Sequence, residues 1–293
     1  MTEIKNLVIP LQRSQIGFSP LIKTVPFELW SLAGRPLIEY LVDEAIQSGI
    51  NEITFVGPSK EKNILNYFNV EPKIEKTLQA QNSKLKETFH LFHQKYQEVK
   101  FNFAFSDKIL SDGAAILQAK NSIKKKAFAI TNSRDLIFGE TPSLKQLIKV
   151  FHASERPIIG LKRISASKIN PQQAVVKVEK IAQKVYKLRE LNSEENDLKG
   201  EEVFTLAGRC ILTNQVLEFA KEVKKEMECP ENLTLEKILN SMLQAGKPVY
   251  GYEVKGRSFD LLSLRNWRKA EASLILNDFG YEKEWQKYFS DID

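Results

Sequence analysis

The chain opens with two short apolar runs separated by a long loop and an amphipathic segment. Residues 6–9 read Asn-Leu-Val-Ile and end at a proline, and residues 50–56 form a second apolar run before Gly57-Pro58. Between them, apolar side chains recur at helical spacing over residues 37–46. A strand, a crossover helix and a second strand in this order predict a βαβ unit, and such units assemble into open, largely parallel sheets. The opening therefore predicts an α/β fold.

The loop between the first strand and the helix is a candidate binding loop. Residues 11–36 are rich in serine, glycine and proline and are long for a connection inside a domain. A later predicted strand, residues 127–131, ends at Asn132-Ser133-Arg134-Asp135. Ligands of open parallel sheets bind beyond the carboxyl ends of the strands. The sequence therefore predicts a site between this segment and the long loop.

Further apolar runs continue the pattern without a repeat or a low-complexity linker. Strands are expected over residues 101–105, 157–161, 174–178, 185–191, 203–212 and 248–254, and helices over residues 114–120, 144–151, 227–246 and 264–279. We therefore expect one domain over residues 1–293. A helical arm at about 59–100 and a C-terminal helical segment at about 264–293 are expected to belong to it.

Composition and charge exclude several classes of function. No apolar run reaches the roughly 20 residues of a membrane span, and the first residues lack the features of a secretory signal. The two cysteines, Cys210 and Cys229, are too few for a disulfide framework, so a cytoplasmic protein is expected. The net charge of +6 is spread along the chain, and the basic run 124–126 has no interleaved aromatic residues, which argues against nucleic acid. His90 and His93 have no third ligand nearby, so no metal is expected there.

Several short sequence motifs occur in the same order and at the same spacing as in one known family. They are Val8-Ile9-Pro10, Phe18, Pro20, Lys23, Pro26, Glu28, Arg35-Pro36-Leu37-Ile38-Glu39-Tyr40, Glu44-Ala45, Gly49-Ile50, Leu110, Gly113, Ala115, Phe128-Ala129, Asp135-Leu136-Ile137, Leu144-Lys145-Gln146-Leu147-Ile148, Gly208-Arg209 and Phe259-Asp260. Over nearly the whole chain they resemble the bacterial UTP-glucose-1-phosphate uridylyltransferases (UDP-glucose pyrophosphorylases) of the sugar nucleotidyltransferase superfamily. The resemblance implies a Rossmann-like, GT-A-like nucleotidyltransferase fold, with a mixed, mostly parallel central sheet flanked by helices.

In this family the phosphate of glucose 1-phosphate attacks the α-phosphorus of UTP and releases pyrophosphate. A glycine-rich loop, an arginine, lysines and Mg²⁺ held by aspartates neutralise the charge. Here Arg13 and Gln15 stand at the glycine positions, and Gly17 stands where the catalytic arginine is expected. The second loop lysine is replaced by Phe27. We expect Arg13, Gln15 and Phe27 to fill part of the cleft.

The resemblance also implies a damaged metal site. Arg134 occupies the position of the first metal aspartate, and Asp260 retains that of the second. A cation at this position opposes a divalent ion. Asp135 is a substitute ligand only if it points to the same side as Arg134, and adjacent residues of an extended segment point to opposite sides. No cofactor is therefore expected, or Mg²⁺ if the chain is an active enzyme.

The remaining site positions come from the same resemblance. Nucleotide binding is expected at Leu11, Gln12, Glu28, Ser106, Gly113 and Arg134, and sugar-phosphate binding at Lys23, Ala174, Glu190 and Asp260. Ordinary structural roles stay open for several of them: a turn for Gly113, helix caps or surface ion pairs for Glu28 and Asp260, and a solvated side chain for Lys23.

The motifs that support the fold are retained. At the charged and glycine positions of the reaction centre, by contrast, several residues differ from those of the family. The sequence therefore predicts a uridylyltransferase-like pseudoenzyme with no intact catalytic residues, acting as a binding, regulatory or oligomerisation partner. The alternative is an active but divergent uridylyltransferase in which Arg13, Lys23 and Arg134 neutralise a phosphate without a metal ion. Expected partners are a sugar nucleotide or other phosphate ligand, and a second copy of the chain or an active relative.

Overall fold

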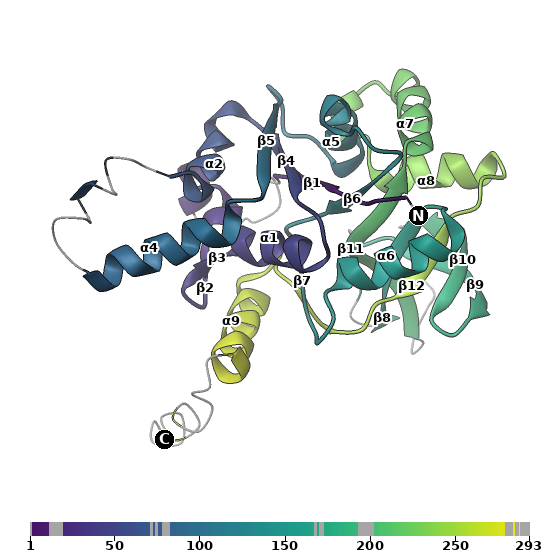
Figure 1. The fold of residues 1–293 in the computed structure, drawn as a ribbon. Coiled ribbons are helices and arrows are strands. Elements are labelled where there is room, and N and C mark those ends of the chain that lie inside the picture. Colours follow the sequence, from purple (N-terminus) through teal and green to yellow (C-terminus); the bar gives the residue numbers. More distant parts are fainter. Residues whose placement is uncertain are drawn as a thin grey trace.

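The computed structural model describes residues 2–11, 20–70, 73, 76–77, 83–166, 169, 173–192, 202–278, 284 and 287. Within this part of the chain, nine strands form one sheet through the centre of the molecule (Figure 1). They are β1 (Asn6–Pro10), β4 (Glu52–Gly57), β5 (Lys100–Phe105), β6 (Ala127–Thr131), β8 (Ile158–Ser165), β9 (Val175–Ala182), β10 (Val185–Asn192), β11 (Glu202–Thr213) and β12 (Tyr250–Glu253). Their order is β5-β4-β1-β6-β11-β8-β12-β10-β9, and β9 also pairs with β11.

The opening βαβ unit is confirmed. β1 and β4 pair in parallel with Leu7 opposite Ile53, and α1 (Leu37–Gln47) lies between them in the chain. After α1 the chain turns at Gly49, whose φ of +83° is one that glycine adopts without strain.

The central sheet is mixed, as the resemblance implies. The pairs β4–β5, β1–β4, β1–β6 and β8–β12 are parallel, and the pairs β6–β11, β8–β11, β10–β12 and β9–β10 are antiparallel. Two small sheets accompany it, one formed by β7 (Asp135–Phe138) with β13 (Arg257–Asp260) and one by β2 (Ser31–Leu32) with β3 (Arg35–Pro36). The expected α/β fold is confirmed, with parallel and antiparallel neighbours in equal number along the described strand order.

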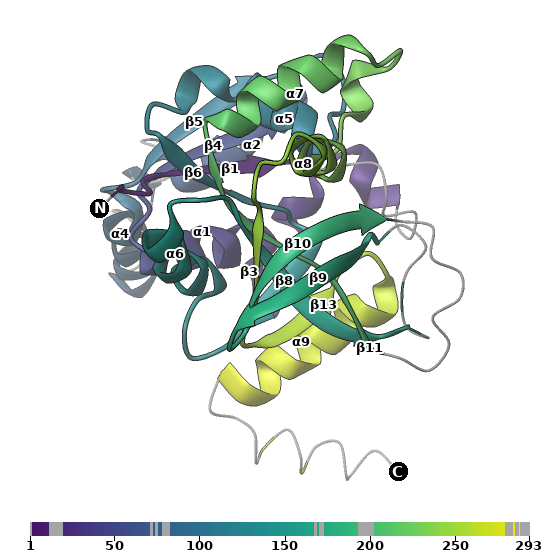
Figure 2. The same ribbon diagram turned by 90° about the vertical axis from the view of Figure 1, so that its right-hand side faces the viewer.

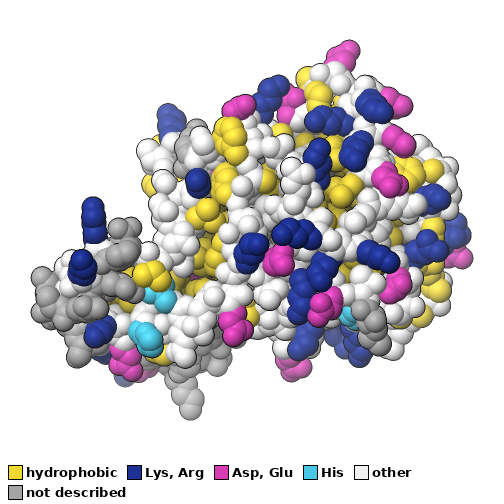
Figure 3. Space-filling view, turned by 45° about the horizontal axis from the view of Figure 1, so that its top comes forward, with side chains coloured by type: hydrophobic (Ala, Val, Ile, Leu, Met, Phe, Trp, Pro, Cys, Tyr) yellow, Lys and Arg dark blue, Asp and Glu magenta, His cyan; other side chains and the backbone are white. Residues whose placement is uncertain are grey.

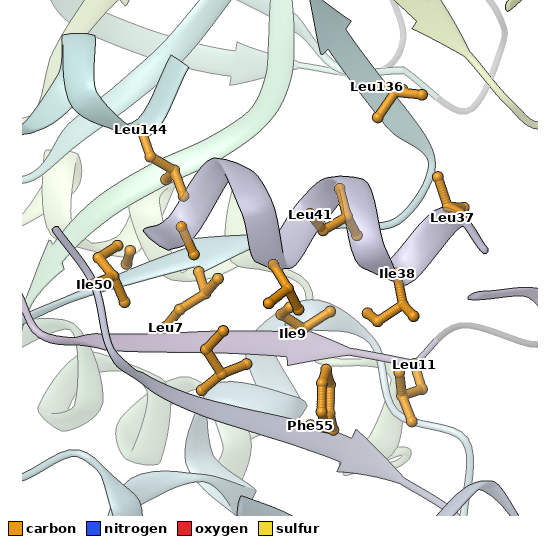
Figure 4. Close-up of a cluster of buried hydrophobic side chains, with 14 of the residues drawn as sticks. Leu7, Ile9, Leu11, Leu37, Ile38, Leu41, Ile50, Phe55, Leu136 and Leu144 are labelled. Atoms are coloured by element: carbon orange, nitrogen blue, oxygen red, sulfur yellow. The ribbon is translucent and has the colours of Figure 1, made fainter. Parts of the chain in front are cut away.

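Side chains of successive strand residues enter two hydrophobic cores, one on each face of the sheet. On β1, Leu7 and Ile9 join one core and Val8 joins the other, because side chains alternate along a strand. The first core includes residues of α1, α2 (Asn63–Phe68), α4 (Ser83–Tyr96), α6 (Ser143–Ser154) and α9 (Leu264–Asp278), and the second includes residues of α5 (Asp112–Gln118), α7 (Gln215–Lys225) and α8 (Leu235–Gln244). Figure 4 shows Leu41 of α1 packed over β1 in the first core.

A buried ion pair joins the centre of the sheet to two of these helices. The guanidinium of Arg209, on β11, is fully buried, and its Nη2 lies 2.9 Å from Oε2 of Glu44 on α1. Nη1 of Arg209 donates to the backbone carbonyl of Asp135 at 2.7 Å. The other oxygen of Glu44 accepts from the backbone N–H of Leu144, at the start of α6, at 3.0 Å. Arg209 and Glu44 thus fix β11, α1, α6 and the chain after β6 relative to one another.

The expectation that Phe27 fills the cleft is wrong. Phe27 begins the 3₁₀ helix η2 (Phe27–Leu29) and is 1% exposed. Its ring packs edge-on against Trp30 and against Trp267 of α9, with ring centroids 5.5 and 5.2 Å apart. Because η2 turns this ring toward α9, Phe27 belongs to the hydrophobic core. Figure 2 shows α9 beside β13, where it covers this side of the molecule.

Several elements depart from the expected pattern. The helix expected over residues 227–246 is a 3₁₀ turn, η6 (Pro230–Asn232), followed by α8, because Pro230 cannot continue a preceding helix and Thr234 caps the next one. Helix α7 and the short strands β7 and β13 were not among the expected elements. Within the described residues, no helix combines the length and the apolar character needed to cross a membrane.

Helix α4 projects from the sheet on the side of β5 (Figure 1). It is tied to α1 by Asp43, which accepts from Tyr96 Oη at 2.9 Å and from Lys95 Nζ at 2.7 Å. His90 and His93 line a groove beside this helix, and Figure 3 shows its histidine side chains on the surface of the projecting lobe. The assignment of residues 59–100 to an arm of a single domain stays a prediction.

We expect Arg209→Met to destabilise the protein by about 3–5 kcal/mol, because the carboxylate of Glu44 would stay buried without its counter-charge. Urea unfolding at neutral pH measures the free energy of unfolding. Arg189→Met is the matched control, since Arg189 forms an exposed ion pair with Glu179 that is worth about 0–1 kcal/mol. A loss below about 1 kcal/mol in Arg209→Met would contradict the role given to this pair.

Candidate functional site

A pocket lies at the carboxyl end of β6, the edge of the sheet where the sequence predicts a site. Its walls come from the turn after β6, from β11, from the segment before β9, from the first residues of α5 and α8, and from the end of β13. The residues that line it are Asp112, Ile130, Asn132, Arg134, Asp135, Gln173, Ala174, Leu206, Gly208, Cys210, Leu235, Glu236, Asp260 and Leu262. The structure thus brings together residues that are up to 150 positions apart in the chain, from Asp112 to Leu262.

Three predicted site residues, Arg134, Ala174 and Asp260, line this pocket. Glu28 lies close to it, because its buried carboxylate accepts a hydrogen bond at 2.8 Å from Ser133 Oγ, next to Arg134. These positions stay predictions as ligand contacts.

The other predicted residues lie elsewhere. Ser106 lines a separate groove that also contains Lys221 and Lys224. Glu190 is exposed on β10, where it pairs with Lys177 of β9 at 3.2 Å. The structure therefore does not bring Ser106 or Glu190 into the pocket with Arg134.

Three more predicted residues have surroundings that suit structural roles. The side chain of Leu11 is buried in the first core, and its backbone N–H donates to the carbonyl of Val56 at 2.8 Å. Gly113 is packed so closely that a Cβ atom would lie 2.8 Å from the backbone oxygen of Leu233. Lys23 is exposed at the end of the 3₁₀ helix η1 (Pro20–Lys23). Gln12, Arg13, Gln15 and Gly17 lie outside the described residues.

Arg134 and Asp135 both line the pocket, and the expectation that their side chains point to opposite sides stays a prediction. The alternation of side chains holds for extended backbone, whereas residues 133–134 form a bend between β6 and β7. The amide of Asn132 closes this bend, since its Oδ1 accepts from the backbone N–H of Asp135 at 3.1 Å. Asn132 in turn lies against Gly208, whose φ is +69° and whose Cβ, if present, would lie 2.6 Å from that oxygen.

Asp135 forms a buried ion pair with Lys162 of β8, which sequence reasoning missed. Asp135 is 6% exposed and Lys162 is 9% exposed. Burial raises the pKa of a carboxyl group, but the Lys162 ammonium and the nearby guanidinium groups of Arg134 and Arg209 outweigh it and hold the pKa of Asp135 below its usual range. The signal in the sequence is a lysine directly after the apolar run 158–161, and its partner is visible only in the fold.

Asp260 faces Asp135 across the β7–β13 pair, in which the two are register partners. Burial and the neighbouring Asp135 carboxylate raise the pKa of Asp260. Its Oδ1 accepts from the backbone N–H of Leu262 at 3.0 Å, and its Oδ2 accepts from Gln173 Nε2 at 3.3 Å. Both oxygens of Asp260 and one of Asp135 therefore already have hydrogen-bond donors from the protein.

These residues do not fit the Mg²⁺ site that the resemblance implies. Mg²⁺ requires oxygen ligands in near-octahedral geometry, and here an ammonium group holds one carboxylate while Arg134 stands close by. Among the described residues, no cluster of three histidine, cysteine, aspartate or glutamate side chains has a metal-binding arrangement. We therefore assign no step of any reaction to a metal ion held by this pair.

Asp112 is an acidic group of the pocket that sequence reasoning missed. Its Oδ1 accepts from the backbone N–H of Gly113 at 2.9 Å and from that of Leu235 at 2.8 Å, so one carboxylate caps α5 and α8 together. Burial, followed by the Glu236 carboxylate, raises the pKa of Asp112 to about 6, although the two N–H donors and Arg134 oppose this. The pocket thus contains acidic groups whose pKa values are shifted in opposite directions.

The fold is that of the nucleotidyl transferases. The chain belongs to the Nucleotidyl transferase family, whose model matches residues 18–286. It is similar to a UTP–glucose-1-phosphate uridylyltransferase of Mycoplasma pneumoniae, with 28% identity over 291 residues and 97% of each chain covered. A uridylyltransferase of the same name from Staphylococcus haemolyticus is 23% identical over 300 residues, covering 100% of this chain and 99% of its own. These relatives confirm the family resemblance drawn from the sequence.

Solved structures agree on the fold. A crystal structure of apo UDP-glucose pyrophosphorylase superposes with a TM-score of 0.82 at 22% identity, covering 93% of this chain and 98% of that one. A UTP-bound UGPase from Acinetobacter baumannii superposes with a TM-score of 0.83 at 23% identity, covering 99% and 100%. A further UDP-glucose pyrophosphorylase is described as complexed with UDP-glucose and gives a TM-score of 0.79 at 21% identity, covering 93% and 99%.

We expect Asp112→Asn to become more stable relative to the unmodified protein as the pH rises from about 4 to about 7. A carboxyl group with a raised pKa binds more protons when folded than when unfolded, so its contribution to stability falls as the pH rises through this window. Asparagine keeps the acceptor oxygen but does not ionise. A pKa of about 6 instead of about 4 limits the effect to roughly 3 kcal/mol.

Urea unfolding at pH 4, 5, 6 and 7 measures this difference in the free energy of unfolding. Asp107→Asn, at an exposed position near Asp112, is the control. A constant difference between Asp112→Asn and the unmodified protein over this pH range would show that Asp112 ionises like an exposed carboxyl.

Proposed function

We propose that this chain is a nucleotidyltransferase of the UTP-glucose-1-phosphate uridylyltransferase type, which joins UTP and glucose 1-phosphate to give UDP-glucose and pyrophosphate. The observation that carries the proposal is the correspondence, over 97% of both chains, with a relative of that name. Neighbours described as bound to UTP or UDP-glucose support a uridine nucleotide as the ligand. The pocket at the carboxyl end of β6 is the proposed place of binding.

In this proposal an oxygen of the glucose 1-phosphate phosphate attacks the α-phosphorus of UTP, and the bond to the β-phosphate breaks. Negative charge accumulates on the transferred group, so cationic side chains in the pocket favour the transition state. Arg134 is the cation on the pocket wall that serves this role. Lys162 is engaged with Asp135 and acts on the charge of the pocket through that carboxylate.

A second candidate is a non-catalytic relative that binds a sugar nucleotide or another phosphate and acts on a partner protein. The Lys162–Asp135 ion pair and Arg134 favour it, because they take the place of the charge arrangement that a metal-dependent uridylyltransferase needs. Association with a second copy or with an active relative, and a cytoplasmic location, are parts of both candidates.

We expect the purified chain to release pyrophosphate only when UTP and glucose 1-phosphate are both present, with kcat at least about tenfold below that of the Mycoplasma pneumoniae relative, a loss of roughly 1.4 kcal/mol or more in transition-state stabilisation. A coupled pyrophosphate assay measures the rate. Arg134→Gln should lower it further, whereas Arg189→Gln, at an exposed position on β10, should not.

In one outcome, pyrophosphate release is no faster with the protein than without it, while UDP-glucose raises the melting temperature of the protein. This result would favour the second candidate over the first. Absence of both turnover and stabilisation would exclude both candidates.

A further inference from the structure

The β7–β13 pair places two carboxylates directly opposite each other. Asp135 and Asp260 are register partners in this pair, and both line the pocket. Like charges at opposed positions of an antiparallel pair repel each other. A positive charge close to the two aspartates relieves this repulsion.

Lys162 supplies that charge from a different strand. Its ammonium group is in direct contact with Oδ1 of Asp135, and both side chains are buried. Lys162 also lies close enough to interact electrostatically with Asp260. Two further cations act on these carboxylates: Arg134 acts on both, and Arg209 acts on Asp135.

An ammonium group and a divalent metal ion exclude each other at this place. An ammonium is a compact donor that needs oxygen acceptors, and Mg²⁺ or Mn²⁺ needs the same oxygens as ligands. One oxygen of Asp135, Oδ1, is held by Lys162, and the Asp260 oxygens accept from Leu262 and Gln173. A metal ion that takes Oδ1 as a ligand would have to displace Lys162 from a buried position.

We propose that Lys162 is a built-in cation that holds Asp135 opposite Asp260 in place of a divalent metal ion, so that this chain binds its nucleotide without Mg²⁺. The first part rests on the contacts of Lys162, and the part on nucleotide binding rests on the proposed function. Lys162 acts through Asp135 and is therefore a positioning residue.

Binding of Mn²⁺, followed by electron paramagnetic resonance of the free ion, tests the first part. The unmodified chain should show no Mn²⁺ site that depends on Asp135 or Asp260. Lys162→Gln should gain one site with affinity at least tenfold higher than any site of the unmodified chain, and adding Asp135→Asn to it should remove that site. Lys180→Gln, an exposed lysine on β9, is the matched control and should gain nothing.

Circular dichroism checks that the variants fold. If Lys162→Gln does not fold, Lys162→Arg, which keeps the positive charge, should fold and gain no Mn²⁺ site. In that case the Mn²⁺ titration of the unmodified chain decides whether the proposal holds. Mn²⁺ binding by the unmodified chain that Asp260→Asn abolishes would overturn the proposal. A folded Lys162→Gln that gains no site would overturn it as well.

Melting temperatures with UDP-glucose, in EDTA and in Mg²⁺, test the second part. We expect the same rise in both solutions for the unmodified chain. A rise that needs Mg²⁺ would overturn the proposal. No rise in either solution, combined with the expected Mn²⁺ results, would support the role of Lys162 and count against the proposed function.

Discussion

The ion pair between Arg209 and Glu44 is the interaction on which the arrangement of the pocket depends. A fully buried guanidinium has a high desolvation cost, and it is stable here because Glu44 and backbone carbonyls accept its hydrogen bonds. Since one of those carbonyls is that of Asp135, the pair fixes the backbone of the segment that carries Arg134 and Asp135. Lys162 then sets the position of the Asp135 side chain. The core and the pocket are therefore held by one continuous set of buried charges.

Much of the fold follows from local patterns. The apolar run at Leu7 to Ile9 predicts a strand buried on both faces, and the structure distributes those side chains between two cores. The pocket is less predictable. The proximity of Lys162 to Asp135 and the closure of the bend by Asn132 both arise from contacts across the fold, which leave no periodic signal in the sequence. The sequence does not predict that Phe27 lies in the core, because the direction of its side chain is set by packing against Trp267, 240 positions away.

Similarity over the whole chain and the chemistry of the pocket bear on different questions. The match of the family model to residues 18–286 establishes the family. Catalysis in such a fold depends on a few charged side chains, and those around Asp135 differ from a carboxylate set open to a metal ion. The similarity therefore identifies the family, while the function proposed for the pocket depends on its local charges.

The glycine at position 208 illustrates a limit on reading function from shared residues. Its left-handed backbone and its contact with the Asn132 amide leave no room for a side chain. Any larger residue would push that amide away and release the backbone N–H of Asp135. A protein with this fold and no enzymatic activity would still need this glycine in order to fold. The Gly208-Arg209 motif therefore reflects a requirement of the fold, and its presence is no evidence of catalytic turnover.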